Sequence, residues 1–141
     1  MSWFGDPVRA VAVCLAFALS ACATLGSGPV CPAGLKPATT AELVFGRNIG
    51  DSLAVSDEDW RGFLDTEITP RFPNGLTIID ASGQWRSAGG AVVQEPAKVL
   101  FLVLTGAPEE QGAIEAVRLA YRTKFHQESV LLIERPACAG F

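Results

Sequence analysis

Two stretches of the chain place apolar residues at helical spacing, and both predict helices that pack on a core. The first begins at Ser56, a good N-cap residue followed by three acids, and ends at Pro70. Its apolar face carries Trp60, Phe63, Leu64 and Ile68. The second opens at Pro108 with acidic residues at its positive end. Its apolar face carries Ile114, Val117, Tyr121 and Phe125.

Short apolar runs between turn-forming residues predict the strands. They lie at residues 43–45, 76–80 with a continuation at 84–86, 91–94, 99–104 and 130–133, and Gly89-Gly90 forms a hairpin tip. The order is strand, helix, strand, strand, helix, strand. This order predicts an α+β, ferredoxin-like βαββαβ fold, a four-stranded antiparallel sheet with two helices on one face.

Two of the predicted strands, 99–104 and 130–133, are apolar without interruption. A sheet covered by helices on one face only should alternate apolar and polar residues, so the second face should also be hidden from water. Three coverings are consistent with this pattern: a homodimer through the open sheet face, the long hairpin around Trp85, or a ligand cavity.

The N-terminal apolar run, residues 10–19, follows Arg9 and ends in Leu19-Ser20-Ala21-Cys22. The run is too short to span a bilayer as a helix, which needs about 20 residues. Small residues before a cysteine are typical of a lipoprotein processing site, so we predict a signal peptide at residues 1–21 and a lipidated Cys22. An ordinary signal peptide with Cys22 merely nearby is the alternative.

This prediction places the protein at the cell envelope, on the periplasmic side, with the membrane as a partner through the lipid. The similarity to bacterial lipoproteins implies the outer membrane rather than the inner one, because Ala23 is not Asp. Residues 22–40 are rich in Gly, Pro, Ser and Thr and predict a flexible tether. Residues 41–141 then form a single domain, since removing 21 of 141 residues leaves 120.

Charge and cysteine content narrow the class of protein further. The net charge is −4 and no basic run is present, so nucleic acid is not expected as a partner. Of four cysteines, Cys14 leaves with the signal peptide and Cys22 carries lipid, so we predict that Cys31 and Cys138 form a disulfide. Redox-active or metal-binding thiols are the alternative. The chain has no Cys-x-x-Cys and one histidine, so no metal site is predicted.

No common catalytic or cofactor motif occurs in the sequence, so no catalytic residue or cofactor is predicted. Polar side chains at predicted strand ends and turns could instead converge on a pocket, where arginines could grip a carboxylate or phosphate. These candidate ligand residues are Arg47, Arg71, Gln84, Trp85, Arg86, Glu95, Lys98 and Glu128. Alternatively, Glu95 with Lys98 and Arg71 with Glu67 are plain ion pairs.

Several segments carry a family resemblance: AELVFGRN (41–48), TPRFPNGLT (69–77), GQWR (83–86), EPAK (95–98) and the stretch from Tyr121 to Val130. With these, the chain resembles domain of unknown function family 3574, a group of uncharacterised bacterial proteins, over residues 41–138. The resemblance implies no catalytic residue and no ligand.

The hypothesis from sequence is therefore a lipid-anchored envelope protein that acts as a non-catalytic binding or assembly module. The alternative is a binding protein or enzyme for a small anionic metabolite, with a pocket lined by arginine and glutamate.

Overall fold

The structure is a computed structural model that describes residues 29–50, 52–86 and 90–141, without the side chain of Trp85. The predicted signal peptide and the predicted lipidation site at Cys22 lie outside the described residues, as does part of the hairpin tip at residues 87–89.

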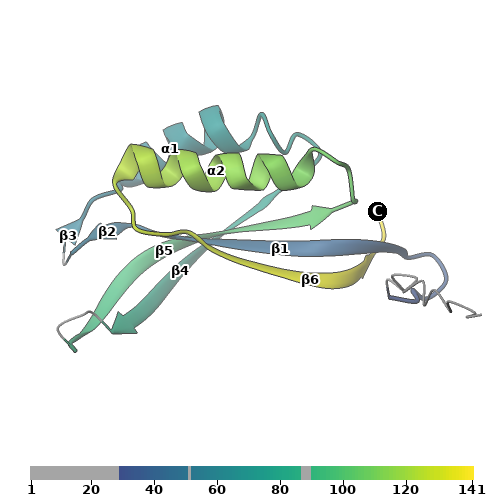
Figure 1. Ribbon diagram of the computed structural model, residues 1–141, viewed down its shortest axis with the longest axis horizontal. Coiled ribbons are helices and arrows are strands. Elements are labelled where there is room, and N and C mark those ends of the chain that lie inside the picture. Colours follow the sequence, from purple (N-terminus) through teal and green to yellow (C-terminus); the bar gives the residue numbers. More distant parts are fainter. Residues whose placement is uncertain (1–28, 51, 87–89) are drawn as a thin grey trace, which may run out of the picture.

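Four long strands form one antiparallel sheet (Figure 1). They are β1 (Lys36–Gly46), β4 (Thr77–Arg86), β5 (Val92–Leu104) and β6 (Leu131–Ala139). Their order across the sheet is β4-β5-β1-β6, so the first strand along the chain lies between the third and the fourth of the four. Both helices lie on the same face of the sheet (Figure 1). The predicted ferredoxin-like α+β fold is thus confirmed.

The central strand β1 begins at Lys36 and not at Ala41, so the segment predicted as a tether over residues 22–40 is wrong in its last part. Residues 36–38 pair with β6 alone, and pairing with β5 begins at Thr39 opposite Leu104. Composition missed this start because Pro37 and the threonines resemble a linker. A proline at the end of a strand, beside a single pairing partner, leaves few ladder positions unfilled.

Strands β4 and β5 are also longer than the apolar runs from which they were predicted. β4 runs without a break through Ser82 and Gly83, and β5 runs through Pro96. Pro96 lies one position beyond the last residue of β1 that pairs with β5, and its carbonyl accepts a hydrogen bond from the Arg47 amide at 3.1 Å. Its missing N–H would point to that same side, past the end of the ladder, so the sheet loses no bond there.

Ser56 caps the first helix, as predicted. Its hydroxyl accepts from the Asp59 amide at 3.1 Å, and the Asp59 carboxylate accepts from the Ser56 amide at 3.1 Å, which completes a capping box. The helix α1 (Asp57–Phe63) continues as one π-helical turn, η1 (Leu64–Ile68), and ends before Pro70. A short hairpin of β2 (Asn48–Ile49) and β3 (Ser52–Leu53) connects β1 to α1.

The second helix, α2 (Glu110–Phe125), begins two residues after Pro108. The Glu110 carboxylate turns back and accepts hydrogen bonds from the amides of Thr105, Gly106 and Ala107 at 2.9–3.1 Å. Burial opposes ionisation of this group, but the amides outweigh burial and lower the pKa of Glu110. The helix is thereby fixed to the end of β5.

An aromatic cluster joins the two helices to the sheet. The rings of Phe45, Phe63 and Phe125 lie 4.8–5.1 Å from the ring of Tyr121 between centroids, and Trp60 lies 5.2 Å from Phe45. The Tyr121 hydroxyl donates to the Gly46 carbonyl at 2.8 Å, and burial raises the pKa of this hydroxyl. Both predicted apolar helix faces are packed in this core, apart from Leu64, which lies at its margin.

The sheet face away from the helices, called the open face below, is apolar and lacks a cover within the described residues. Alternate residues of β1 and β5 fill the core, so their neighbours point to the opposite side. The apolar side chains placed on the open face by this register are Val44, Ile79, Val99, Phe101, Val103, Leu131 and Ile133. Ile79 and Leu131 remain 50% and 55% exposed, so the β4–β5 hairpin does not cover them.

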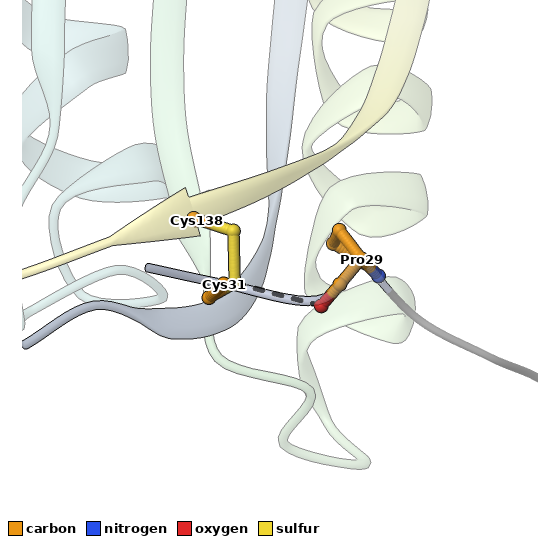
Figure 2. Close-up of a disulfide and its surroundings, with 3 residues drawn as sticks. All are labelled: Pro29, Cys31 and Cys138. Carbon is orange, nitrogen blue, oxygen red and sulfur yellow. Dashed lines mark hydrogen bonds between the residues drawn. A yellow bond between two sulfur atoms is a disulfide. The ribbon is translucent and has the colours of Figure 1, made fainter. Parts of the chain in front are cut away.

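The predicted disulfide between Cys31 and Cys138 is present, with 5.6 Å between the two Cα atoms (Figure 2). It joins the segment before β1 to the second-last residue of β6, and β1 and β6 already pair from Lys36 opposite Ala139. Pro29 lies beside the bridge, its carbonyl oxygen 3.6 Å from the Cys31 sulfur.

We expect the double substitution Cys31→Ser and Cys138→Ser to lower the free energy of unfolding by about 4 kcal/mol, because the bridge closes a very long loop in the unfolded chain. The two cysteines are 107 residues apart. Denaturant unfolding measures the change, and the reduced wild-type protein should match the variant. A variant as stable as the oxidised wild type would contradict this prediction.

Candidate functional site

The largest gathering of charged side chains lies at the C-terminal end of β1, on the helix side of the sheet. Arg47 directly follows β1, Asp57 opens α1, and Lys98 and Asp80 lie in β5 and β4. Register brings the last two together: Lys98 is opposite both Phe45 and Asp80, so all three point toward the helices. We call Arg47, Asp57, Asp80 and Lys98 the charged cluster.

Each cation of the charged cluster contacts a carboxylate. Arg47 Nη1 lies 3.0 Å from Asp57 Oδ1, and its Nε donates to the Val55 carbonyl at 2.8 Å. Lys98 Nζ lies 3.4 Å from the same Asp57 oxygen and also pairs with Asp80. Asp57 therefore bridges the two cations, and the cluster joins the end of β1 to α1, β4 and β5.

Burial is uneven within the cluster. Arg47 and Lys98 are only 8% and 9% exposed, whereas the side chains of Asp57 and Asp80 are 69% and 83% exposed. The hydrogen bond from Lys98 and the charge of Arg47 lower the pKa of Asp57. Two cations and two carboxylates balance, so the cluster carries no surplus positive charge that would attract an anion. Its arrangement fits a structural role, in which the ion pairs hold the start of α1 against the sheet.

Glu95 lies at the same end of the sheet and has a different role. Its carboxylate accepts from the Asn48 amide at 2.8 Å, beyond the end of β1. A Cβ at position 46 would lie 2.5 Å from Glu95 Oε1, so Gly46 leaves the room that this carboxylate occupies. Gln127, after α2, donates to the Asn48 carbonyl at 3.0 Å. Both backbone groups of Asn48 are thus held by side chains.

The predicted pair between Glu95 and Lys98 is wrong. Residues three apart in a strand point to opposite faces of the sheet, so Lys98 faces the helices and Glu95 faces away. The predicted pair between Arg71 and Glu67 is confirmed, at 2.9 Å across one turn after η1. Arg71 comes before β4, and the first residue of β4, Thr77, pairs with Phe101 in the middle of β5. Arg71 is therefore away from the end of the sheet that carries the charged cluster.

The remaining candidates do not join a common site. Arg86 donates to the Gly90 carbonyl at 2.9 Å within the β4–β5 hairpin, and Gln84 and Glu128 are exposed. The backbone of Trp85 lies in β4, and its side chain is outside the described part of the chain. The structure therefore brings together Arg47 and Lys98, with Glu95 nearby on the other face.

Two shallow hollows, of about 470 and 250 Å³, lie elsewhere, at the start of β1 and the end of β5. They share Thr39, Leu104 and Gly106, and the larger one is mostly apolar. None of the candidate ligand residues with a described side chain lines either hollow.

Sequence reasoning missed the two carboxylates that complete the charged cluster. Asp57 was assigned only to the helix N-terminus, and Asp80 only to the end of a strand. Ile78 pairs with Leu100, and the register of β4 against β5 then places Asp80, two positions after Ile78, opposite Lys98, two positions before Leu100. That register cannot be read from the sequence until the strands are known to be continuous.

Residues 29–50, 52–86 and 90–141, which the structure describes, contain no group of three or more His, Cys, Asp or Glu side chains placed to hold a metal ion. No helix among them combines the length and the apolar character that crossing a bilayer requires.

The family described as "Protein of unknown function (DUF3574)" matches residues 40–141. No curated protein matches the chain. Two solved structures are similar, a phage SAM lyase in complex with S-methyl-5'-thioadenosine and a phage SAM lyase in the apo state. Their TM-scores are 0.56 and 0.55 and their sequence identities 20% and 18%, and each match covers 74% of this chain and 90% of the other. At that identity the likeness is one of fold.

We expect acid to weaken the charged cluster through Asp57. Because its pKa in the folded protein is below the ordinary value of 3.8, its contribution to stability is complete above pH 3.8 and is lost as the pH falls through the lower, folded value. The free energy of unfolding should therefore fall more steeply below pH 3.8 in the wild type than in Asp57→Asn.

Denaturant unfolding at a series of pH values measures this difference. Asp65→Asn is the matched control, since Asp65 is exposed on η1 and forms no ion pair among the described residues. A wild type and an Asp57→Asn variant with parallel pH profiles would contradict the assignment.

Proposed function

The chain belongs to the DUF3574 family of proteins of unknown function, and from this premise we propose that it is a lipid-anchored module on the periplasmic side of the cell envelope. In this proposal it is a non-catalytic binding or assembly module. It pairs with a second copy through the open face of its sheet.

The observation that carries the proposal is the open face itself. Seven apolar side chains from four adjacent strands lie there, and both helices occupy the other side of the sheet (Figure 1). A contiguous apolar surface of this kind on a small domain is typical of an interaction site. Two such faces can stack about 10 Å apart, as the inner faces of a β-sandwich do.

In a two-fold dimer the same surface of each copy meets its equivalent, so the surface must be complementary to itself. An apolar face meets this condition, because it brings no like charges together. The one described ion pair on the open face, Arg135 with Glu42 at 2.7 Å, is already satisfied within the chain. Arg135 is 61% exposed at its side chain and lies near the margin, where polar groups commonly surround an apolar interface. Glu95 lies at the far end of the same face, where its carboxylate accepts from the Asn48 amide, so the apolar part of the face brings no unpaired charge to the contact.

Support for the anchor comes from the disulfide. A bridge between Cys31 and Cys138 suits an oxidising compartment such as the periplasm. Cys22 precedes Pro29, the first described residue, by seven positions, which span at most about 25 Å. A lipid on Cys22 would thus hold the domain close to the membrane surface.

The charged cluster and the hollows do not favour the rival reading, a pocket for an anionic metabolite. Arg47 and Lys98 are neutralised by aspartates, and Arg71 and Arg86 have partners elsewhere. The likeness to a phage SAM lyase extends to the fold, and a shared fold does not transfer an activity. The proposal therefore contains no lyase activity.

We expect Cys22→Ser to abolish incorporation of radiolabelled palmitate and to release the protein from the membrane fraction, because the thiol that would carry the lipid is gone. Cys14→Ser is the matched control, since it changes the other cysteine of the N-terminal segment, and it should keep both label and membrane association. Label that survives Cys22→Ser, or no label in the wild type, would refute the anchor.

We expect the chain that begins at Ala23 to be a dimer in sedimentation velocity, and the double substitution Ile79→Lys and Leu131→Lys to raise its dissociation constant at least about 100-fold. Each lysine would place an unpaired ammonium in the contact, which costs several kcal/mol. Leu119→Lys is the control, because Leu119 is 61% exposed on α2, away from the sheet. A monomeric wild type, or a variant that remains dimeric, would count against the pairing.

A further inference from the structure

A second exposed apolar surface surrounds the disulfide, at the end of the sheet opposite the charged cluster. It contains Val30, Leu35 and Phe141, which are 98%, 41% and 104% exposed. We call these three residues the apolar end. Large apolar side chains scattered singly over a surface are ordinary, but three grouped at one end of a small domain indicate a contact.

The covalent and strand connections hold the three residues near one another. Val30 is next to Cys31, whose partner Cys138 lies three residues before Phe141. Lys36 pairs with Ala139, and Leu35 is close enough to Gly140 that a Cβ there would lie 2.8 Å from Leu35 Cδ2. In Figure 1 the start of β1 and the end of the chain lie together at one end of the sheet.

The larger hollow continues the apolar end toward α2. It has a volume of about 470 Å³, and its lining includes Pro29, Pro37, Leu104 and Pro136. Only one charged side chain, Lys36, occurs in residues 29–37 and 136–141. This end is thus apolar with one cation, a combination that suits the boundary between headgroups and acyl chains of an anionic bilayer.

We propose that the apolar end lies against the phospholipid bilayer, with Val30, Leu35 and Phe141 entering its interface. This inference rests on the lipid anchor proposed above, because Cys22 is within about 25 Å of Pro29 in any conformation of the chain between them. The lipid keeps the apolar end at the membrane, and the apolar end fixes which way the domain points.

The orientation has a geometric consequence for the rest of the domain. β1 has 11 residues, so the strand spans about 36 Å at 3.3 Å per residue. The charged cluster, the β2–β3 hairpin and the β4–β5 hairpin lie at or beyond its far end. They therefore project away from the bilayer. The strands then run roughly along the membrane normal, so the open face points sideways and can contact a second anchored copy.

The test places one tryptophan at each end of the domain. Val30→Trp reports on the apolar end, and Val92→Trp is the matched control, since Val92 is a valine 58% exposed at the far end of β5. Each acylated protein is reconstituted in vesicles of phosphatidylethanolamine and phosphatidylglycerol, with or without bromine on the acyl chains. Flotation reports anchoring, and quenching of tryptophan emission by bromine reports contact with lipid.

We expect all proteins to float, and the added emission of Val30→Trp to be quenched at least about twice as strongly as that of Val92→Trp, because interfacial side chains lie about 5–10 Å into the headgroup boundary. Phe141→Trp should behave as Val30→Trp does, which guards against a local effect at one site. Floating proteins with equal quenching at both ends overturn the orientation and leave the anchor intact. Proteins that do not float overturn the anchor and this inference with it.

Discussion

Packing of the aromatic cluster against β1 determines the rest of this molecule. Phe45 points from the central strand into the rings of Trp60, Phe63 and Tyr121, so one residue of the sheet contacts both α1 and α2. The Tyr121 hydroxyl satisfies the Gly46 carbonyl at the point where β1 ends. Because both helices are held on this side, neither covers the apolar residues on the opposite face of the sheet, where Ile79 and Leu131 are exposed. The proposed interaction surface is thus a direct result of how the core is filled.

Much of this fold could be predicted from local patterns, since each helix has an apolar face and a recognisable start, the Ser56 cap for α1 and Pro108 followed by acidic residues for α2. Ser56 and Tyr121 lie where such patterns place them, at the start of α1 and inside the core. The ends of the strands were missed because they are set by pairing with neighbouring strands, which local sequence does not reveal. Pro37 and Pro96 look like strand breaks in the sequence. Pro37 lies before the pairing of β1 with β5 begins, and Pro96 lies just after that pairing ends, so neither proline costs the sheet a hydrogen bond.

The candidate site was less predictable, because a charge acquires its role from residues far away in the sequence. Arg47 and Lys98 were both among the predicted candidate ligand residues, and they do lie together. Their partners Asp57 and Asp80 come from α1 and β4, and only the register across three strands brings the four groups to one place. The disulfide was predictable for the opposite reason: once Cys14 of the predicted signal peptide and Cys22 at the predicted lipidation site are set aside, Cys31 and Cys138 allow a single pairing.

The position of that disulfide also determines how the domain resists mechanical load. A pull on the chain ahead of Cys31 passes through the bridge into the end of β6 as well as into the start of β1. Those two strands are antiparallel neighbours paired from Lys36 to Val44, and the bridge ties them at the same end, so the load is shared between β1 and β6. Without the bridge, the same pull would act on the start of β1 alone. The crosslink therefore distributes tension over two strands at the end of the domain where it would enter.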